Sequence, residues 1–465
     1  MTRVLGFPTL LFLFAASVWG QIKLPPYSRR VLPNGVTLLV VKRAGVPLVN
    51  IDVAVKGGKE SEPQALPGIS SVTADLLRKG TTSYSADQFS NSLDALGGSY
   101  RVRADEQMTL LESEFLAKDF SRGLSLVADA ILHPTFPNDE VVKLLGQRRD
   151  DIKALKDNPS EAISPYAHAF FFGVTHPYGR IIDEESVSRI TGSDIEQYYR
   201  RLYNAHNFIV AVAGDVDPAA VSREAEQAFA RAPSGEPYRW NPPIELSRPA
   251  ADRLMLIDKP GATQSYFYIV QPGIAAGNPD RVAIRVVNTL FGGRFTSMLN
   301  EELRVKTGLS YGARNAIETD RLEGMNAIET FTKTDSTGHA LEIAISTLKA
   351  LRNQGITADQ LASAKAYLKG TIPRETLETG DQLARQLIRL EVLGYNRDEI
   401  DSLFERIDAV TLSQANVVAK NYFRTSGLTF VLIGDAAKIR SQLVKFSPHL
   451  QEASIAKPGF GTVSN

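Results

Sequence analysis

Side chains that could do chemistry are few in this chain and widely spaced. It has no cysteine, so no thiol can act as a nucleophile or a metal ligand. Neither a G-x-S-x-G motif nor a Walker-type phosphate loop is present. No two histidines have the H-x-x-H or H-x-x-x-H spacing that would place them on one face of a helix. We therefore interpret the six histidines as turn or packing residues: His133, His168, His176, His206, His339 and His449.

The stretch 68–81 is the element around which a site would be organised. Pro67 and Gly68 precede its first apolar residue, and Gly80 follows its last. Its apolar residues recur with the period of a helix, at Ile69, Val72, Leu76 and Leu77. These signals predict a helix that begins after Pro67 and ends at Gly80.

This helix resembles the zinc-site helix of the insulinase, pitrilysin and mitochondrial-processing-peptidase family of zinc metallopeptidases. Active members carry H-x-x-E-H in the frame Gly-Leu-Ala-His-x-x-Glu-His-Met-Leu-Phe-Lys-Gly-Thr, and those three positions are Ser71, Ala74 and Asp75 here. The family's third ligand, a glutamate, corresponds to Asp151. A catalytic zinc takes three protein ligands, and the glutamate of the motif activates water. The resemblance therefore implies a degenerate motif, with no catalytic residue, no bound metal and no cofactor in this chain.

A second stretch, residues 291–311, keeps the family's pattern. It reads Phe291-Gly-Gly-Arg-Phe-Thr-Ser-Met-Leu-Asn-Glu-Glu-Leu-Arg-Val-Lys-Thr-Gly-Leu-Ser-Tyr311. In the family an arginine, and a tyrosine seven residues later, bind the backbone of the substrate peptide, and Arg304 and Tyr311 match that pair. A guanidinium can donate to a peptide carbonyl, and a phenol can donate to a carbonyl oxygen that becomes an oxyanion. The alternatives are a helix-end salt bridge for Arg304 and a buried core position for Tyr311.

The two halves of the chain repeat one pattern. Residues 207–213 form a predicted strand that ends in Gly214-Asp215 before a helix, and residues 428–433 do the same before Gly434-Asp435. We predict an α+β fold with two similar domains from an internal duplication, each an antiparallel sheet packed with helices. The resemblance implies the same architecture. The predicted parts are a signal peptide over 1–20, an N-terminal peptidase-like domain with the degenerate zinc site over 21–232, a linker over 233–250, and a C-terminal peptidase-like domain with the Arg–Tyr pair over 251–465.

The start of the chain and its composition indicate export. Arg3 precedes an apolar run over 5–19, and Val18 and Gly20 precede Gln21, as in a secretory signal peptide. The alternative is a transmembrane anchor, but the run is shorter than the about 20 residues that a span needs. The formal net charge is zero and no basic stripe is present, so nucleic acid is not an expected partner. We expect a secreted, periplasmic protein that starts at Gln21 and has no stable membrane anchor.

A lost metal site beside a retained Arg–Tyr pair indicates a division of labour. In two-subunit members of the family, one subunit carries the zinc helix and a homologous subunit supplies the Arg–Tyr pair. We therefore predict a non-catalytic subunit, not an enzyme on its own, which binds peptide substrate and completes the active site of an H-x-x-E-H partner that holds the zinc. One alternative is a homodimeric peptide-binding or scaffolding module without a peptidase partner. The other is a metallopeptidase that uses a divergent site with Asp75 and Asp151.

Overall fold

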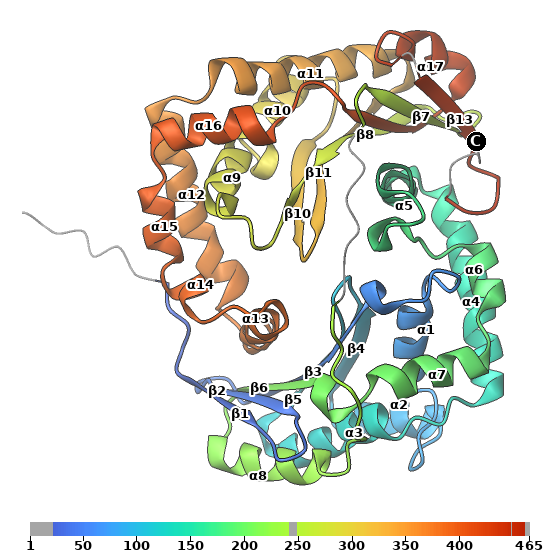
Figure 1. The fold of residues 1–465 in the computed structure, drawn as a ribbon, viewed down its shortest axis with the longest axis vertical. Helices are drawn as coiled ribbons and strands as arrows, with labels where there is room; N and C mark the ends of the chain where they lie inside the picture. The colour runs from blue at the N-terminus through green and yellow to red at the C-terminus, as the bar shows by residue number, and fades with distance from the viewer. Residues whose placement is uncertain (1–21, 241–248, 448, 461–465) are drawn as a thin grey trace, which may run out of the picture.

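Two β-sheets, one in each half of the chain, form the framework of the protein (Figure 1). The computed structural model describes residues 22–240, 249–447 and 449–460, so the predicted signal peptide and residues 241–248 of the predicted linker lie outside the described residues. The first sheet has the order β1-β2-β6-β3-β5-β4, with strands β1 Tyr27–Val31, β2 Thr37–Lys42, β3 Leu48–Lys56, β4 Ser99–Ala104, β5 Met108–Leu116 and β6 Phe208–Gly214. The second has the order β13-β7-β12-β8-β11-β10-β9, with strands β7 Arg253–Asp258, β8 Gln264–Pro272, β9 Ile274–Ala275, β10 Ala313–Asp320, β11 Glu323–Lys333, β12 Thr429–Gly434 and β13 His449–Ser454.

The two sheets share one topology once the edge strands β1, β9 and β13 are set aside. The order β2-β6-β3-β5-β4 of the first sheet corresponds to β7-β12-β8-β11-β10 of the second. In both, the first pair is parallel and the following pairs are antiparallel. The predicted α+β fold with two similar domains is therefore confirmed. The predicted antiparallel pairing holds along β6-β3-β5-β4 and β12-β8-β11-β10. The pairs β2–β6 and β7–β12 are parallel, because the long connection within each pair returns the chain in the same direction.

Helices surround both sheets. Those of the first half are α1 Ile69–Leu76, α2 Ala86–Ala95, α3 Phe120–Leu132, α4 Asn138–Asp157, α5 Pro159–Phe172, α6 Glu184–Arg189, α7 Gly192–Leu202 and α8 Pro218–Phe229. Those of the second half are α9 Arg281–Asn288, α10 Met298–Asn300, α11 Thr337–Gln354, α12 Ala358–Thr376, α13 Gly380–Leu393, α14 Asp398–Asp401, α15 Leu403–Ala409, α16 Leu412–Tyr422 and α17 Ala436–Leu443. Two π-helical segments, Thr289–Gly293 and Glu301–Lys306, flank α10. No helix in the described ranges is long and apolar enough to span a membrane.

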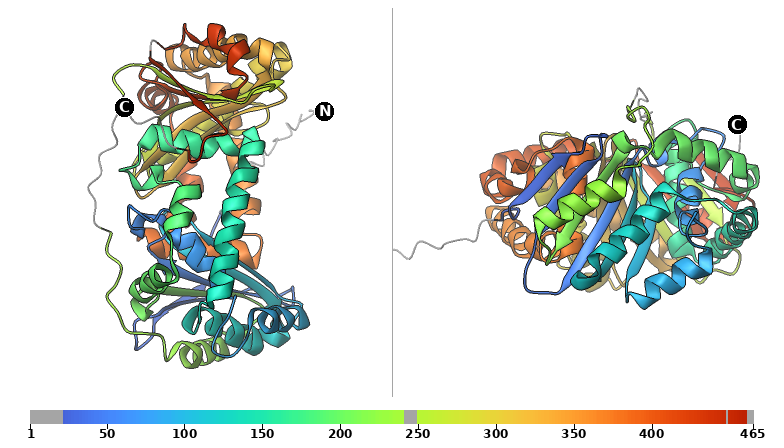
Figure 2. Two further views of the ribbon diagram at one scale, coloured as in Figure 1. Left: turned by 90° about the vertical axis from the view of Figure 1, so that its right-hand side faces the viewer. Right: turned by 90° about the horizontal axis from the view of Figure 1, so that it is seen from below.

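Each half contributes one helix to the sheet of the other half. Helix α13 of the second half packs on β2, β3 and β6 of the first sheet, whereas α5 of the first half packs on β8 and β12 of the second. Leu387 and Ile388 of α13 share a buried cluster with Ile209 of β6. Phe170 of α5 shares another with Ile433 of β12. Figure 1 shows α5 beside the upper sheet and α13 above the lower one, and Figure 2 shows the long helix α4 running between the two sheets. The two halves are therefore interlocked.

This exchange explains why the strands β6 and β12 are almost entirely apolar. All residues of β6, with the sequence Phe-Ile-Val-Ala-Val-Ala-Gly, and all residues of β12 are buried. Alternate residues of β6 enter two clusters: Ile209 and Ala211 face α13, whereas Val210 and Val212 pack with residues of α3 and α8. A strand covered on both faces reads as a continuous apolar run, because neither face can carry polar side chains.

Candidate functional site

Helix α1 is the structural counterpart of the predicted zinc-site helix, but it is shorter than predicted. It ends at Leu76, because the Leu77 N–H bonds to the Ala74 carbonyl at 3.3 Å and the Lys79 N–H bonds to the Leu76 carbonyl at 2.9 Å, which closes the helix in turns. Its N-cap is Gly68, whose φ of 91° lies in the left-handed region that glycine tolerates. A side chain there would also collide with Ile182.

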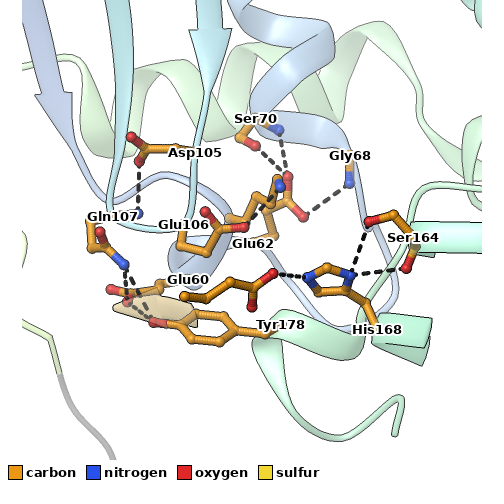
Figure 3. A network of polar contacts seen from close by, with 12 residues as sticks. Glu60, Glu62, Gly68, Ser70, Asp105, Glu106, Gln107, Ser164, His168 and Tyr178 are labelled. Atoms are coloured by element: carbon orange, nitrogen blue, oxygen red, sulfur yellow. Dashed lines mark hydrogen bonds and ion pairs between the residues drawn. The ribbon is translucent and has the colours of Figure 1, made fainter. Parts of the chain in front are cut away.

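The buried carboxylate of Glu62 anchors the N-terminus of α1. It accepts hydrogen bonds from the backbone N–H of Gly68 at 2.9 Å and of Ser70 at 3.0 Å, and also from the Ser70 hydroxyl. These bonds satisfy N–H groups that the first turn of a helix leaves free. Burial raises the pKa of Glu62, and the hydrogen bonds from Ser70 and Gly68 counteract part of that rise. Figure 3 shows this anchor beside the polar network described below.

The three positions that correspond to the zinc motif are occupied by groups that do not fit zinc. The Ser71 hydroxyl donates to the Gly68 carbonyl at 2.9 Å, and Ala74 is buried and has no donor atom. Asp75 forms an ion pair with Arg148 of α4. Zinc in proteins takes histidine, cysteine and carboxylate ligands in tetrahedral sets, and the only carboxylate of this motif is already held by a guanidinium.

Asp151, at the position of the third ligand, lies exposed on α4 one turn beyond Arg148. Across the described ranges, no three His, Cys, Asp or Glu side chains are grouped so that they could hold a metal ion. Arg148 takes the place that a cation would need next to Asp75, which the sequence alone did not indicate. The alternative of a divergent metal site built from Asp75 and Asp151 gains no support from this geometry.

Arg304 and Tyr311 lie together at the surface of the second half. Arg304 belongs to the π-helical segment Glu301–Lys306, and its guanidinium carbon lies 4.9 Å from the centre of the Tyr311 ring and 4.5 Å from that of Phe295. The guanidinium is thus placed against two aromatic faces, an arrangement that orients a cation without neutralising it. Tyr311 is 77% exposed, which excludes the buried core position. Among the described residues Arg304 has no carboxylate partner, which excludes the helix-end salt bridge.

A groove of about 620 Å³ runs beside this pair. Tyr266, Tyr268 and Phe331 of the second sheet line it, and Ile163 of α5 contributes from the first half. Tyr266 and Phe331 stack with their ring centres 5.3 Å apart. Aromatic walls with a few polar groups suit an extended peptide, whose side chains need apolar contact and whose backbone needs donors and acceptors.

A polar network at the junction of the two halves lies close to the start of α1 (Figure 3). Glu60 accepts from the Tyr178 hydroxyl at 3.1 Å and from the Gln107 amide at 3.4 Å, and it pairs with Arg321 of the second half at 3.3 Å. Burial raises the pKa of Glu60 to about 7, against the opposing effects of Arg321 and of the hydrogen bonds. Burial, together with the charge of Glu106, raises the pKa of Asp320 to about 7 as well. Sequence reasoning missed this network, because its members are far apart in the chain.

His168 joins the same junction, although it was interpreted as a turn or packing residue. Its Nε2 lies 3.0 Å from Glu318 of β10. Burial disfavours the imidazolium, but the hydrogen bond and charge of Glu318 outweigh it and raise the pKa of His168. Ser164, His168 and Glu318 resemble a Ser–His–acid triad, yet Nδ1 lies 2.9 Å from the Ser164 carbonyl, which can only accept. That nitrogen therefore carries a proton and cannot act as a base toward the Ser164 hydroxyl.

His176, which is buried, supports the interpretation of the histidines as turn and packing residues. It accepts from the Tyr178 N–H at 3.1 Å and stacks on Phe172 with ring centres 4.7 Å apart. Burial lowers its pKa to about 4, so the ring is neutral near pH 7. Its predicted role as a turn and packing residue is confirmed.

The fold and the degenerate helix define a peptidase-like protein, and comparisons with known proteins identify its family. The sequence pattern of the insulinase family, peptidase family M16, matches residues 38–183, and that of the peptidase M16 inactive domain matches residues 189–368. The uncharacterized zinc protease YmxG of Bacillus subtilis is 24% identical over 415 residues, which cover 89% of this chain and 99% of that protein. The uncharacterized zinc protease SCO5738 of Streptomyces coelicolor is 25% identical over 410 residues, 86% of this chain and 88% of that protein.

Solved structures share the fold. A peptidase M16 inactive domain from Pseudomonas fluorescens superposes with a TM-score of 0.80 at 21% identity, over 88% of this chain and 98% of that chain. A protease from Helicobacter pylori does so with a TM-score of 0.81 at 20% identity, over 88% of this chain and 100% of that chain. The protein is a homologue of peptidase family M16 in which the H-x-x-E-H motif is replaced by Ser71, Ala74 and Asp75.

Proposed function

We propose that this chain is the non-catalytic subunit of an exported zinc metallopeptidase. It binds the substrate peptide and places Arg304 and Tyr311 in the active site of a homologous partner subunit that carries H-x-x-E-H and the zinc. One observation carries the proposal: the exposed Tyr311 and the half-buried Arg304 line a groove, whereas the remaining carboxylate of the metal motif is paired with Arg148. Alone, the chain lacks the ligands and the base that hydrolysis requires.

Exposed apolar side chains around the pair support a partner surface. Phe295 is 68% exposed and Val305 is 67% exposed, and both lie in the same stretch as Tyr311. Large apolar side chains grouped at a surface are typical of interaction sites, because burying them in a complex removes apolar area from water. Residues 295–311 would therefore contact both the peptide and the partner subunit.

The test compares turnover by the reconstituted complex with wild-type and Tyr311→Phe subunits at matched complex concentration. Phe keeps the ring over Arg304 and removes only the hydroxyl, so assembly should be unchanged. If the hydroxyl donates to the developing oxyanion, its loss costs about 3 kcal/mol, or about a hundredfold in kcat.

Tyr367→Phe is the matched control. Tyr367 is 40% exposed and also lies under a guanidinium, that of Arg294 at 5.9 Å, but it is not part of the groove. This variant should retain wild-type turnover. Equal rates for wild-type and Tyr311→Phe would remove the proposed role of the phenol.

The second candidate is a homodimeric peptide-binding module without a peptidase partner, which the aromatic groove favours. Co-purification from the native host with mass spectrometry separates the two. A homologue that carries H-x-x-E-H in stoichiometric amount supports the peptidase subunit, whereas recovery of this chain alone as a dimer supports the module.

A further inference from the structure

A second cavity, which shares no lining residue with the groove, lies among helices of the second half. It has a volume of about 420 Å³, and α9, α12, α13 and α14 contribute to its walls. Figure 1 shows α9, α12 and α14 on the left and α13 below them, nearer the centre. The size falls within the range of about 300–1,000 Å³ that is usual for small-molecule sites.

The interior of this cavity is apolar. Its buried lining side chains come from several parts of the chain, and Ile22 is the first residue that the structure describes. They are Ile22, Ile274, Ile284, Ile372, Leu390 and Ile400. Polar lining groups are largely engaged elsewhere. The Asn288 amide donates to the Asn315 carbonyl at 3.1 Å, and the Thr376 hydroxyl bonds to the Ile372 carbonyl at 2.6 Å. A ligand of this cavity therefore meets apolar contacts over most of its surface.

Of the three arginines that line the cavity, Arg285 and Arg389 have no carboxylate partner among the described residues. Arg281 and Arg406 both bind Glu399, at 3.2 Å and 3.1 Å, which neutralises that carboxylate. Arg285 and Arg389, by contrast, are exposed, and their guanidinium groups have no hydrogen bond or ion pair with any described residue. Although solvent reaches Arg285, the protein atoms around it desolvate the guanidinium and lower its pKa; the exposed carboxylate of Glu375 raises that pKa, and the charge of Arg389 lowers it. Two like charges thus lie near each other at the edge of an apolar cavity.

We propose that this cavity binds a small amphipathic carboxylate, whose chain occupies the apolar interior and whose head pairs with Arg285 and Arg389. Guanidinium groups bind carboxylates through paired, charge-assisted hydrogen bonds, and a single anion would relieve the repulsion between the two cations. The site does not depend on the proposed peptidase role, since none of its lining residues lies in the groove of Arg304 and Tyr311.

The experiment titrates the purified full-length mature chain with octanoate by isothermal calorimetry, without any partner subunit. We expect saturable binding of one octanoate per chain. Each methylene added between hexanoate and octanoate should tighten the dissociation constant about fourfold, because each becomes buried. Octanol, which lacks the charge, and acetate, which lacks the chain, should both bind at least about tenfold more weakly than octanoate.

Arg285→Gln and Arg389→Gln test the head-group contacts, since both residues are exposed and their replacement should leave the fold intact. Each should weaken octanoate about tenfold or more, as expected for the loss of a charged hydrogen bond. Arg122→Gln, on the exposed face of α3, is the matched control and should bind like wild type. Absence of binding, non-saturable binding, or equal affinity in all three variants would overturn the proposal. Inorganic phosphate binding as tightly as octanoate would also overturn it, because the apolar interior would then contribute nothing.

Discussion

Replacing Glu60 by Gln should flatten the pH dependence of stability. Burial raises the pKa of Glu60 from the ordinary glutamate value of 4.5 to about 7. Such a raised pKa means that the folded protein favours the neutral carboxyl. Its contribution to stability is therefore complete below the unfolded pKa and is lost as the pH rises through the folded pKa.

The size of the effect follows from the shift. A rise of the Glu60 pKa from 4.5 to about 7 corresponds to about 3 kcal/mol, and about 2 kcal/mol of this falls between about pH 5.5 and about pH 8.5. The pair with Arg321 at 3.3 Å acts in the opposite direction, because it favours the carboxylate. In the folded protein burial is the larger effect, since Glu60 lies at the junction of the two halves with only 8% of its surface exposed.

The assay is urea-induced unfolding of wild type and Glu60→Gln at about pH 5.5 and about pH 8.5. Gln has nearly the same shape and no charge, so the variant should lose about 2 kcal/mol less than wild type over this interval. A residual slope is expected, because Asp320 has a pKa of about 7 for a similar reason. Glu196→Gln, at a position that is 53% exposed, is the control and should keep the wild-type slope.

Identical pH slopes for wild type and Glu60→Gln would refute the reasoning. That result would mean that Arg321 compensates fully for burial, so that Glu60 is already ionised at about pH 5.5 in the folded protein. Double replacement of Glu60 and Arg321 would then show whether their pairing is the dominant interaction, because the energy of the pair appears as the non-additive part of the two effects.

Three further predictions concern the fold, the lost metal site and export. Leu387→Ala in α13 should lower the free energy of unfolding by about 2–5 kcal/mol. Unfolding should remain a single transition, because α13 is shared between the halves. Melting of the first sheet alone, at a lower temperature than the rest, would contradict this. Metal analysis should find no stoichiometric zinc in the purified chain or in its Asp75→His variant, because one histidine does not supply three ligands. Chelator-sensitive peptide hydrolysis by either protein would be incompatible with this expectation. N-terminal sequencing of the exported protein should begin at Gln21, whereas a cytoplasmic protein that begins at Met1 would rule out the signal peptide.

Local signals in the sequence were sufficient to find most of the elements. The apolar run before Gly214-Asp215 is β6, and that before Gly434-Asp435 is β12, each followed by a helix. An apolar run and the Gly-Asp turn that ends it are defined by neighbouring residues in the chain, so this pattern can be recognised without knowledge of the fold. The repeat of the pattern also predicted two domains with one topology.

The partners of buried helices could not be predicted in the same way. The apolar residues of α13 show that one of its faces is buried, but they do not say against which sheet, and the structure places it on the sheet of the other half. The ion pair between Asp75 and Arg148 joins positions 73 residues apart. The exposure of Tyr311 likewise depends on where the surrounding helices end. Each of these features depends on tertiary packing, and the periodicity of residues in a single sequence does not reveal which elements pack together.

The contrast between the two candidate sites lies in their balance of charge. At the degenerate metal site, the Asp75 carboxylate forms an ion pair with the Arg148 guanidinium, and the Ser71 hydroxyl donates to the Gly68 carbonyl. Neither group is therefore left to bind a cation. At the second site, the Arg304 cation lies over two rings and has no ion-pair partner among the described residues, and the exposed Tyr311 phenol lies beside it. A group whose interactions are complete within the chain stabilises the fold, whereas an exposed donor set held in place by aromatic faces is available to another molecule. This is why the function of the chain is expected at Arg304 and Tyr311, although the motif that first identifies the family lies at α1.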